Sequence, residues 1–169
     1  MIFLKTDDEI ELLRKSNLLV GKTLAEIAKV IKPGVTTKEL DKVAEEFIRD
    51  NGAVPTFKGF PNQYGEPFPA SICTSVNEQV VHGIPSDDVV LKEGDVVSVD
   101  CGTYMNGFCG DSAYTFCVGE VDEEVRKLLK VTKEALYIGI QNAVQGKRLG
   151  DIGYACLLYT SDAADDLIG

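Results

Sequence analysis

The feature that most constrains the fold is the dipeptide Asn106-Gly107, which stands between two strand-like runs, Asp95–Thr103 and Phe108–Val118. Asn-Gly between such runs is typical of a tight β-hairpin, because a type I′ turn requires positive φ at both central residues. The sequence therefore predicts two antiparallel strands joined by this pair of residues.

The turn determines which residues of the two strands face each other. With a two-residue loop, Gly102 pairs with Asp111, and Asp100 pairs with Ala113. Residues two apart along a strand share a face, so Asp100 and Asp111 are predicted to project from the same side as a diagonal pair. A loop longer or shorter by one residue would place them on opposite faces.

Asp100 and Asp111 would repel each other at short range, and burial would strengthen the repulsion. Proteins keep such pairs where a cation bridges them or where one of the two carries a proton. Gly102 and Gly110 beside the pair leave room for the close approach of an ion or a backbone. The spacing alone leaves two other interpretations open: solvated aspartates on an exposed sheet face, and paired-acid catalysis as in glycosidases.

Helical patterns flank the hairpin on both sides. The capping boxes Thr6–Glu9 and Thr36–Glu39 predict a long helix that ends at Lys32 and a second helix that ends at Asn51. After the hairpin, a third helix is expected over Glu123–Gln145. The start of another helix follows at residues 149–152, with little chain left to complete it.

The stretch from Ala53 to Val118 alternates with a period of two, which indicates strands. It includes a further strand at Ala70–Thr74 and a loop rich in proline and glycine at Gly59–Pro69. Helices, then strands, then a helix predict an α+β fold, with helices packed on one face of a mainly antiparallel sheet.

The composition argues against several classes of function. The 169 residues suffice for one domain with a sizeable core, and 44% of them are hydrophobic. The net charge of -10 argues against a nucleic acid or an anionic membrane as the main partner. The sequence has no apolar run of membrane-spanning length and no signal-peptide pattern, so we expect a cytoplasmic location. The five cysteines lack C-x-x-C spacing, which predicts reduced thiols, four of them buried in or beside strands.

His82 is the single histidine of the chain, between an apolar run and a turn-forming Gly83. Near a hydrolytic site its imidazole could donate a hydrogen bond to a substrate as bond breaking begins. A lone histidine is also compatible with a purely structural role. One histidine cannot support a nucleophilic triad, and no G-x-S-x-G motif is present.

The segments around these residues resemble the type I methionine aminopeptidases. Ser71–Pro85 resembles the family's signature around its substrate-binding histidine, and Leu91–Asp100 with Gly107–Asp111 resembles its first metal-binding hairpin. The resemblance predicts an amino-terminal portion of the catalytic domain at 1–154. It also leaves a tail at 155–169 that does not resemble the family and looks like an assembly artefact.

This resemblance implies a pita-bread fold, of which the chain would hold the amino-terminal half with part of the second half missing. It implies removal of the initiator methionine by two-metal hydrolysis, with two divalent ions such as Co, Mn, Fe or Zn. Asp100 would bind one metal and Asp111 would bridge both. His82 would contact the substrate, while Cys73 and Phe68 would line the pocket for the methionine side chain.

The implied partners are nascent polypeptides that begin with methionine and a small residue, with the ribosome as a further candidate. The family is usually monomeric. The chain departs from the family because no histidine follows His82. The later glutamates lie in a turn and a helix rather than on strands: Glu120, Glu123, Glu124 and Glu134. We therefore expect the chain alone to be inactive and to expose apolar faces that a second half would cover.

Two alternatives remain open, one from another class and one within the enzyme class. One is a non-catalytic pita-bread module that binds peptides or proteins, although such a module has no need for Asp100 and Asp111 in this spacing. The other is a proline-specific relative such as prolidase. The stretch Asn77–Pro85 resembles the methionine enzymes better.

Overall fold

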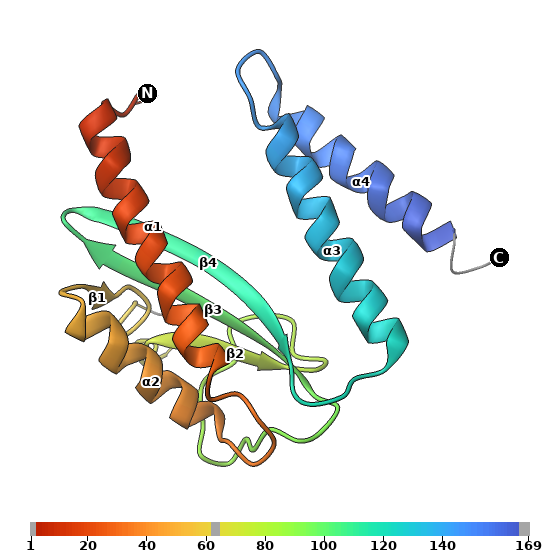
Figure 1. Ribbon diagram of the computed structural model, residues 1–169. Coiled ribbons are helices and arrows are strands. Elements are labelled where there is room, and N and C mark those ends of the chain that lie inside the picture. The colour runs from red at the N-terminus through yellow and green to blue at the C-terminus, as the bar shows by residue number, and fades with distance from the viewer. Residues whose placement is uncertain (1–2, 62–64, 166–169) are drawn as a thin grey trace. The chain divides into compact units, whose positions relative to one another are not determined.

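The computed structural model describes residues 3–61 and 65–165, which divide into two compact units, Met1–Val121 and Asp122–Gly169. The first unit contains a four-stranded antiparallel sheet with β3 at its centre (Figure 1). β4 pairs along one side of β3, and β1 and β2 pair along the other side. The strand bounds are Val54–Pro55 for β1, Ile72–Val76 for β2, Val96–Met105 for β3 and Phe108–Cys117 for β4.

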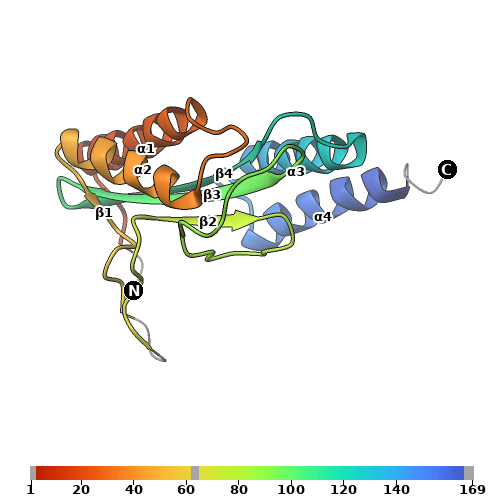
Figure 2. The same cartoon turned by 90° about the horizontal axis from the view of Figure 1, so that it is seen from below.

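Two helices, α1 (Asp7–Ala28) and α2 (Thr37–Asp50), cover one face of this sheet (Figure 2). Both predicted capping boxes are present, because the threonine hydroxyl accepts from the N3 backbone and the N3 glutamate accepts from the N-cap backbone. The core between the layers is built from fully buried aliphatic side chains, among them Ile27, Leu40, Ile48, Val97 and Val99. The predicted α+β arrangement is confirmed for this unit.

The first helix ends earlier than predicted. α1 stops at Ala28, and Lys29 is its C-cap, whereas the sequence pattern runs on to Lys32. The apolar residues Val30 and Ile31 pack against the core from a turn rather than from the helix. Both residues are apolar at positions that continue the helical repeat, so the sequence pattern extends the helix through them. A buried residue fits a turn after the helix as well as the final turn of the helix itself.

β2 also differs from its predicted position, because it begins at Ile72 rather than Ala70. The buried carboxylate of Asp41 on α2 accepts the backbone N–H of Ser71 at 2.7 Å and that of Ile72 at 3.3 Å. These two N–H groups therefore donate to the Asp41 side chain, whereas in a β-ladder they would donate to the backbone of a neighbouring strand. This contact spans about thirty residues, and the local sequence pattern does not contain it.

The cysteines are less buried than predicted. All five are free, but of the four expected in buried surroundings only Cys73 and Cys101 are buried. Cys109 is exposed and Cys117 is half-buried, because both lie on β4, which pairs only with β3 among the described strands. An edge strand shields its side chains less than a central strand does.

The second unit is a pair of packed helices, α3 (Glu123–Asn142) and α4 (Leu149–Asp165). α3 ends three residues before the predicted Gln145. α4 is a helix of 17 residues, so the chain completes the element whose start was predicted at residue 149. Gly139 allows the close approach of Cys156, since a Cβ there would lie 2.9 Å from the Cys156 sulfur. Within the described residues, no helix has the length and apolarity needed to cross a membrane.

Candidate metal and substrate site

The β3–β4 hairpin has the predicted turn and register. Asn106 and Gly107 both have positive φ, at 53° and 85°. Gly102 pairs with Asp111, and Asp100 pairs with Ala113. The prediction of a two-residue loop that places both carboxylates on one face is confirmed.

That face is the one that α1 and α2 leave uncovered. Along β3, Val97, Val99, Cys101 and Thr103 are fully buried on the helix side. The alternate residues of β3 point the other way, and Asp100 among them is only half-buried. The pair of carboxylates therefore lies on the open side of the sheet.

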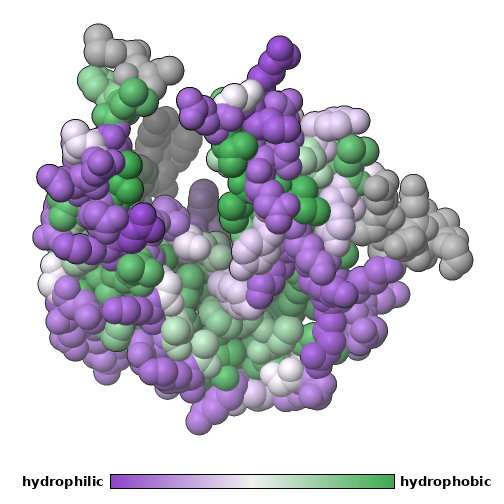
Figure 3. Space-filling view, turned by 45° about the horizontal axis from the view of Figure 1, so that its top comes forward, coloured by the Kyte–Doolittle hydropathy of each residue, from purple (hydrophilic) through white to green (hydrophobic). Residues whose placement is uncertain are grey.

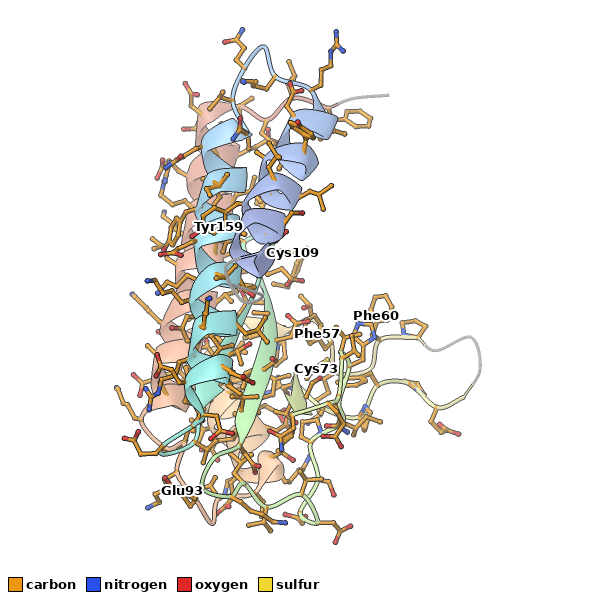
Figure 4. All side chains as sticks on the ribbon, turned by 90° about the vertical axis from the view of Figure 1, so that its right-hand side faces the viewer. Phe57, Phe60, Cys73, Glu93, Cys109 and Tyr159 are labelled. Carbon is orange, nitrogen blue, oxygen red and sulfur yellow. The ribbon has the colours of Figure 1, made fainter. Side chains whose placement is uncertain are left out.

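A cavity of about 670 Å³ opens on this side and is lined by all five residues singled out in the sequence. Asp100, Asp111, Cys73, His82 and Phe68 come from three strands and two loops. Figure 4 shows Phe57, Phe60 and Cys73 together on the side of the sheet away from α1. The structure thus brings the predicted residues to one pocket.

Asp100 is electrostatically strained in this pocket. Burial raises the pKa of its carboxyl, and the nearby charge of Asp111 raises it further. The Cys101 backbone N–H and His82 act in the opposite direction without cancelling the shift of the Asp100 pKa. A divalent cation between the two carboxylates would relieve this repulsion, because it favours the charged form of both.

Cys73 is the partner of Asp100 across β2 and β3, and its side chain is 5% exposed. Burial, with smaller contributions from Asp100 and Asp111, raises the pKa of the Cys73 thiol to about 11. The thiol is therefore protonated at neutral pH and presents a small, neutral, polarisable surface to the cavity. It is unsuited to nucleophilic chemistry in this state.

His82 lies at the rim of the cavity on a loop rather than on a strand. Its φ of 59° is in the left-handed region, which a residue with a side chain rarely adopts. The next residue holds it there: Gly83 accepts the Thr74 N–H at 2.9 Å and donates its own N–H to the Ser75 hydroxyl at 3.2 Å. A Cβ at Gly83 would lie 2.1 Å from the Thr74 carbonyl oxygen, so only glycine allows this docking.

Aromatic residues that the sequence reasoning missed complete the wall of the cavity. Phe57 and Phe60 line it together with Phe68. Phe60 and Phe68 are linked by a backbone hydrogen bond of 3.0 Å, which closes the base of the loop between them. The sequence signal for these residues was the concentration of aromatics at both ends of the Gly59–Pro69 loop, of which residues 62–64 lie outside the described part.

Gly102 has a packing role in the same wall. A Cβ at this position would lie 2.1 Å from the Thr56 hydroxyl and 2.9 Å from the Phe57 ring. The prediction that Gly102 leaves room for an ion or a backbone is wrong, because side chains fill this space. The room is taken by Thr56 and Phe57, which the short strand β1 brings against β3.

The donors present suit only part of a metal site. Two carboxylates are hard oxygen ligands, and a raised Asp100 pKa beside a second acid is the mark of a pair that a cation would stabilise. Within the described residues, no group of three or more histidine, cysteine, aspartate or glutamate side chains is placed to hold an ion. Asp100 and Asp111 therefore fit as part of a ligand set.

Comparison with known proteins places the chain in a family. The pattern of metallopeptidase family M24 matches residues 11–165. A methionine aminopeptidase of Clostridium acetobutylicum is 52% identical over 159 residues, which are 94% of this chain and 62% of that protein. Methionine aminopeptidase 1 of Bacillus subtilis is 47% identical, with coverage of 96% and 63%. The chain thus spans less than two thirds of the length of these relatives.

Solved structures agree with the sequence relatives. The methionine aminopeptidase of Rickettsia prowazekii superimposes with a TM-score of 0.87 at 38% identity, covering 96% of this chain and 63% of that one. The prolidase of Pyrococcus furiosus gives a TM-score of 0.80 at 21% identity, with coverage of 94% and 44%, and shows the fold alone.

These likenesses confirm the α+β, pita-bread prediction. The expected boundary at residue 154 is not tested by them and stays a prediction. Membership of a metallopeptidase family also implies dependence on a divalent metal. With its paired acids and its match over residues 11–165, the chain belongs to metallopeptidase family M24.

Proposed function

We propose that this chain supplies the amino-terminal part of a methionine aminopeptidase, which removes the initiator methionine from nascent polypeptides in the cytoplasm as they leave the ribosome. The observation that carries the proposal is the placement of Asp100 and Asp111 on one face of the β3–β4 hairpin, at the floor of an apolar cavity. Relatives with identities of 47–52% carry that name. The Xaa-Pro dipeptidase of Bacillus anthracis is only 25% identical, so a proline-specific function is not favoured.

In this proposal Asp100 and Asp111 would hold two divalent metal ions, Asp100 as a ligand of one and Asp111 as a ligand of both. Carboxylate ligands suit Mn, Fe, Co or Zn. When bound, such ions activate a water molecule and polarise the carbonyl of the scissile bond. The role of the hairpin is to hold two acidic oxygens at a fixed separation before any ion arrives.

The substrate's methionine side chain occupies the cavity beside these acids. Phe57, Phe60 and Phe68 supply aromatic walls, and the neutral thiol of Cys73 forms part of the base. A thioether packs favourably against aromatic edges, which suits a methionine side chain. His82 at the rim donates a hydrogen bond to the substrate as the peptide bond is broken.

The 169-residue chain by itself should release little or no methionine from a Met-Ala-Ser peptide in the presence of Mn²⁺ or Co²⁺. Two carboxylates leave each ion short of ligands, so further histidine and glutamate ligands have to come from other residues. Robust release by the chain alone would show that this requirement is wrong.

The binding step is testable on the same chain by alkylation of Cys73. A Met-Ala-Ser peptide that occupies the cavity should protect Cys73 from iodoacetamide, as measured by mass spectrometry of the Cys73 peptide. A Glu-Ala-Ser peptide is the matched control, because its charged side chain does not suit aromatic walls. Equal protection by both peptides, or by neither, would argue against a methionine pocket.

A further inference from the structure

Asp111 lies on β4, and its backbone N–H has no partner within the described part of the sheet. In a hairpin closed by a two-residue turn, hydrogen-bonded and non-hydrogen-bonded pairs alternate from the closing pair, Met105 with Phe108. The pair Gly102–Asp111 is therefore of the non-hydrogen-bonded kind, and the N–H of Asp111 points away from β3. β4 has no second strand partner among the described residues.

Asn17 on α1 occupies this outer position. Its side-chain oxygen accepts the backbone N–H of Asp111 at 3.4 Å, and its amide nitrogen donates to the Leu13 carbonyl at 2.9 Å. The second bond fixes the orientation of the amide group, so that its oxygen faces the strand. The first bond is long, which suits an orienting contact rather than a strong stabilising one.

The helix is held against the strands on both sides of this contact. A Cβ at Gly110 would lie 2.6 Å from the Ser16 carbonyl carbon and 2.7 Å from the Asn17 nitrogen, so the two backbones touch. The buried hydroxyls of Ser16 and Thr103 lie 2.9 Å apart, and the Thr103 hydroxyl donates to the Ser16 carbonyl at 3.1 Å. Asn17 therefore meets Asp111 at a place where the helix cannot slide.

Two other asparagines show which part of this arrangement is specific. Asn51 and Asn142 each donate their side-chain amide to the carbonyl four residues earlier at 2.9 Å, as Asn17 does. A bond of this type within a helix is thus general in the chain. The contact with the backbone of a candidate metal ligand belongs to Asn17.

We infer that Asn17 is a positioning residue for the metal site: it holds the backbone of Asp111 so that the carboxylate keeps its place beside Asp100. This inference rests on the proposed function, in which Asp111 bridges two metal ions. Ser16 and Thr103 fix the position of α1 on the sheet, whereas Asn17 orients the backbone of Asp111. Loss of a group that orients a metal ligand typically weakens metal binding by roughly 10–100-fold.

The test measures the dissociation constant of Mn²⁺ by electron paramagnetic resonance on the full chain, well below its unfolding temperature. Asn17→Ala and Asn17→Leu are suitable variants, because alanine and leucine are both good helix formers. Each should weaken Mn²⁺ binding by up to about tenfold. This is the lower end of the range for such groups, because the chain supplies only part of the ligand set. Both should also speed hydrogen exchange at the Asp111 amide, measured by nuclear magnetic resonance. Ser16→Ala should lower the unfolding temperature and leave the Mn²⁺ constant unchanged, and Asn142→Ala should alter neither.

Asp111→Asn separates the inference from the proposed function. If Asp111→Asn leaves Mn²⁺ binding unchanged, the metal site itself is wrong and the role of Asn17 is lost with it. If Asp111→Asn abolishes binding while the Asn17 variants bind Mn²⁺ as tightly as the original chain, only the positioning role is overturned. Equal weakening by Ser16→Ala and the Asn17 variants would make Asn17 a structural residue and overturn the inference as well.

Discussion

Cys73 and Asp100 are direct partners across β2 and β3, so a thiol and a carboxyl face the same cavity from neighbouring strands. The thiol responds to the charge of both acids, because its raised pKa depends on burial first and then on Asp100 and Asp111. Cys73 can therefore report on the electrostatics of the acidic pair without being part of it.

Alkylation of Cys73 should be slow at pH 8 and faster in Asp111→Asn. With a pKa of about 11, only roughly one Cys73 thiol in a thousand is ionised at pH 8, and removal of one negative charge lowers the pKa. Peptide-resolved mass spectrometry after iodoacetamide treatment measures the rate, with the half-buried Cys117 at the far end of β4 as the internal control. An unchanged Cys73 rate in Asp111→Asn would mean that the two groups do not interact.

The raised pKa of Asp100 predicts a specific dependence of stability on pH in the presence of a chelator. The folded chain holds the Asp100 proton more tightly than the unfolded chain does, so stability falls as the pH rises from the unfolded value through the folded value. Asp100→Asn should therefore stabilise the chain at neutral pH and have no such effect below about pH 3.5, where the carboxyl is protonated in both states.

Urea unfolding of both forms between pH 3 and pH 8 gives the difference directly. Groups that do not interact with Asp100 contribute equally to the two curves and cancel, so the difference reports on Asp100 together with its charged neighbours. A stabilisation that is constant over the whole pH range would show that packing, rather than charge, explains the effect of the substitution.

Gly110→Ala should destabilise the first unit by about 1–3 kcal/mol, because the new methyl group would overlap the backbone of α1 at Ser16. Gly21→Ala is the matched control. Gly21 lies within α1 with nothing near its position, so the same change there should stabilise by up to about 1 kcal/mol through helix propensity. Thermal or urea unfolding should thus give shifts of opposite sign, and two shifts of the same sign would contradict the contact.

Asp41→Ala should cost about 2–4 kcal/mol, since it leaves the backbone N–H groups of Ser71 and Ile72 buried without an acceptor. Asp41→Asn retains an acceptor oxygen and should cost less. Asp50→Ala on the exposed end of the same helix is the control and should change the free energy of unfolding by no more than about 0.5 kcal/mol. A loss no larger for Asp41→Ala than for Asp50→Ala would show that the strand start does not depend on this carboxylate.

The parts of the fold that the sequence predicts are those determined by local chemistry. Asn106 and Gly107 require a particular turn, and that turn alone sets the register of Gly102 with Asp111. The capping boxes at Thr6 and Thr36 are equally local, and both are formed. The placement of both acids on one face needed no knowledge of the rest of the molecule.

The parts that were missed depend on contacts between distant segments. Asp41 on α2 bonds to the backbone at the start of β2, about thirty residues away in the sequence. Phe57 and Phe60 line the cavity beside the hairpin only once the chain has folded. Asn17 lies within the first predicted helix, but its bond to Asp111 joins residues far apart in sequence. Periodicity locates such a residue on a helix and cannot identify what it touches.

A single tight turn brings Asp100 and Asp111 to one face, so their register depends only on residues that are close in sequence. Contacts between residues close in sequence form early in folding, since little chain entropy is lost in closing the loop. The register of such a segment is therefore set before distant segments pack against it. The pocket walls come from distant segments, so they can vary without altering the register that places Asp100 and Asp111 on one face.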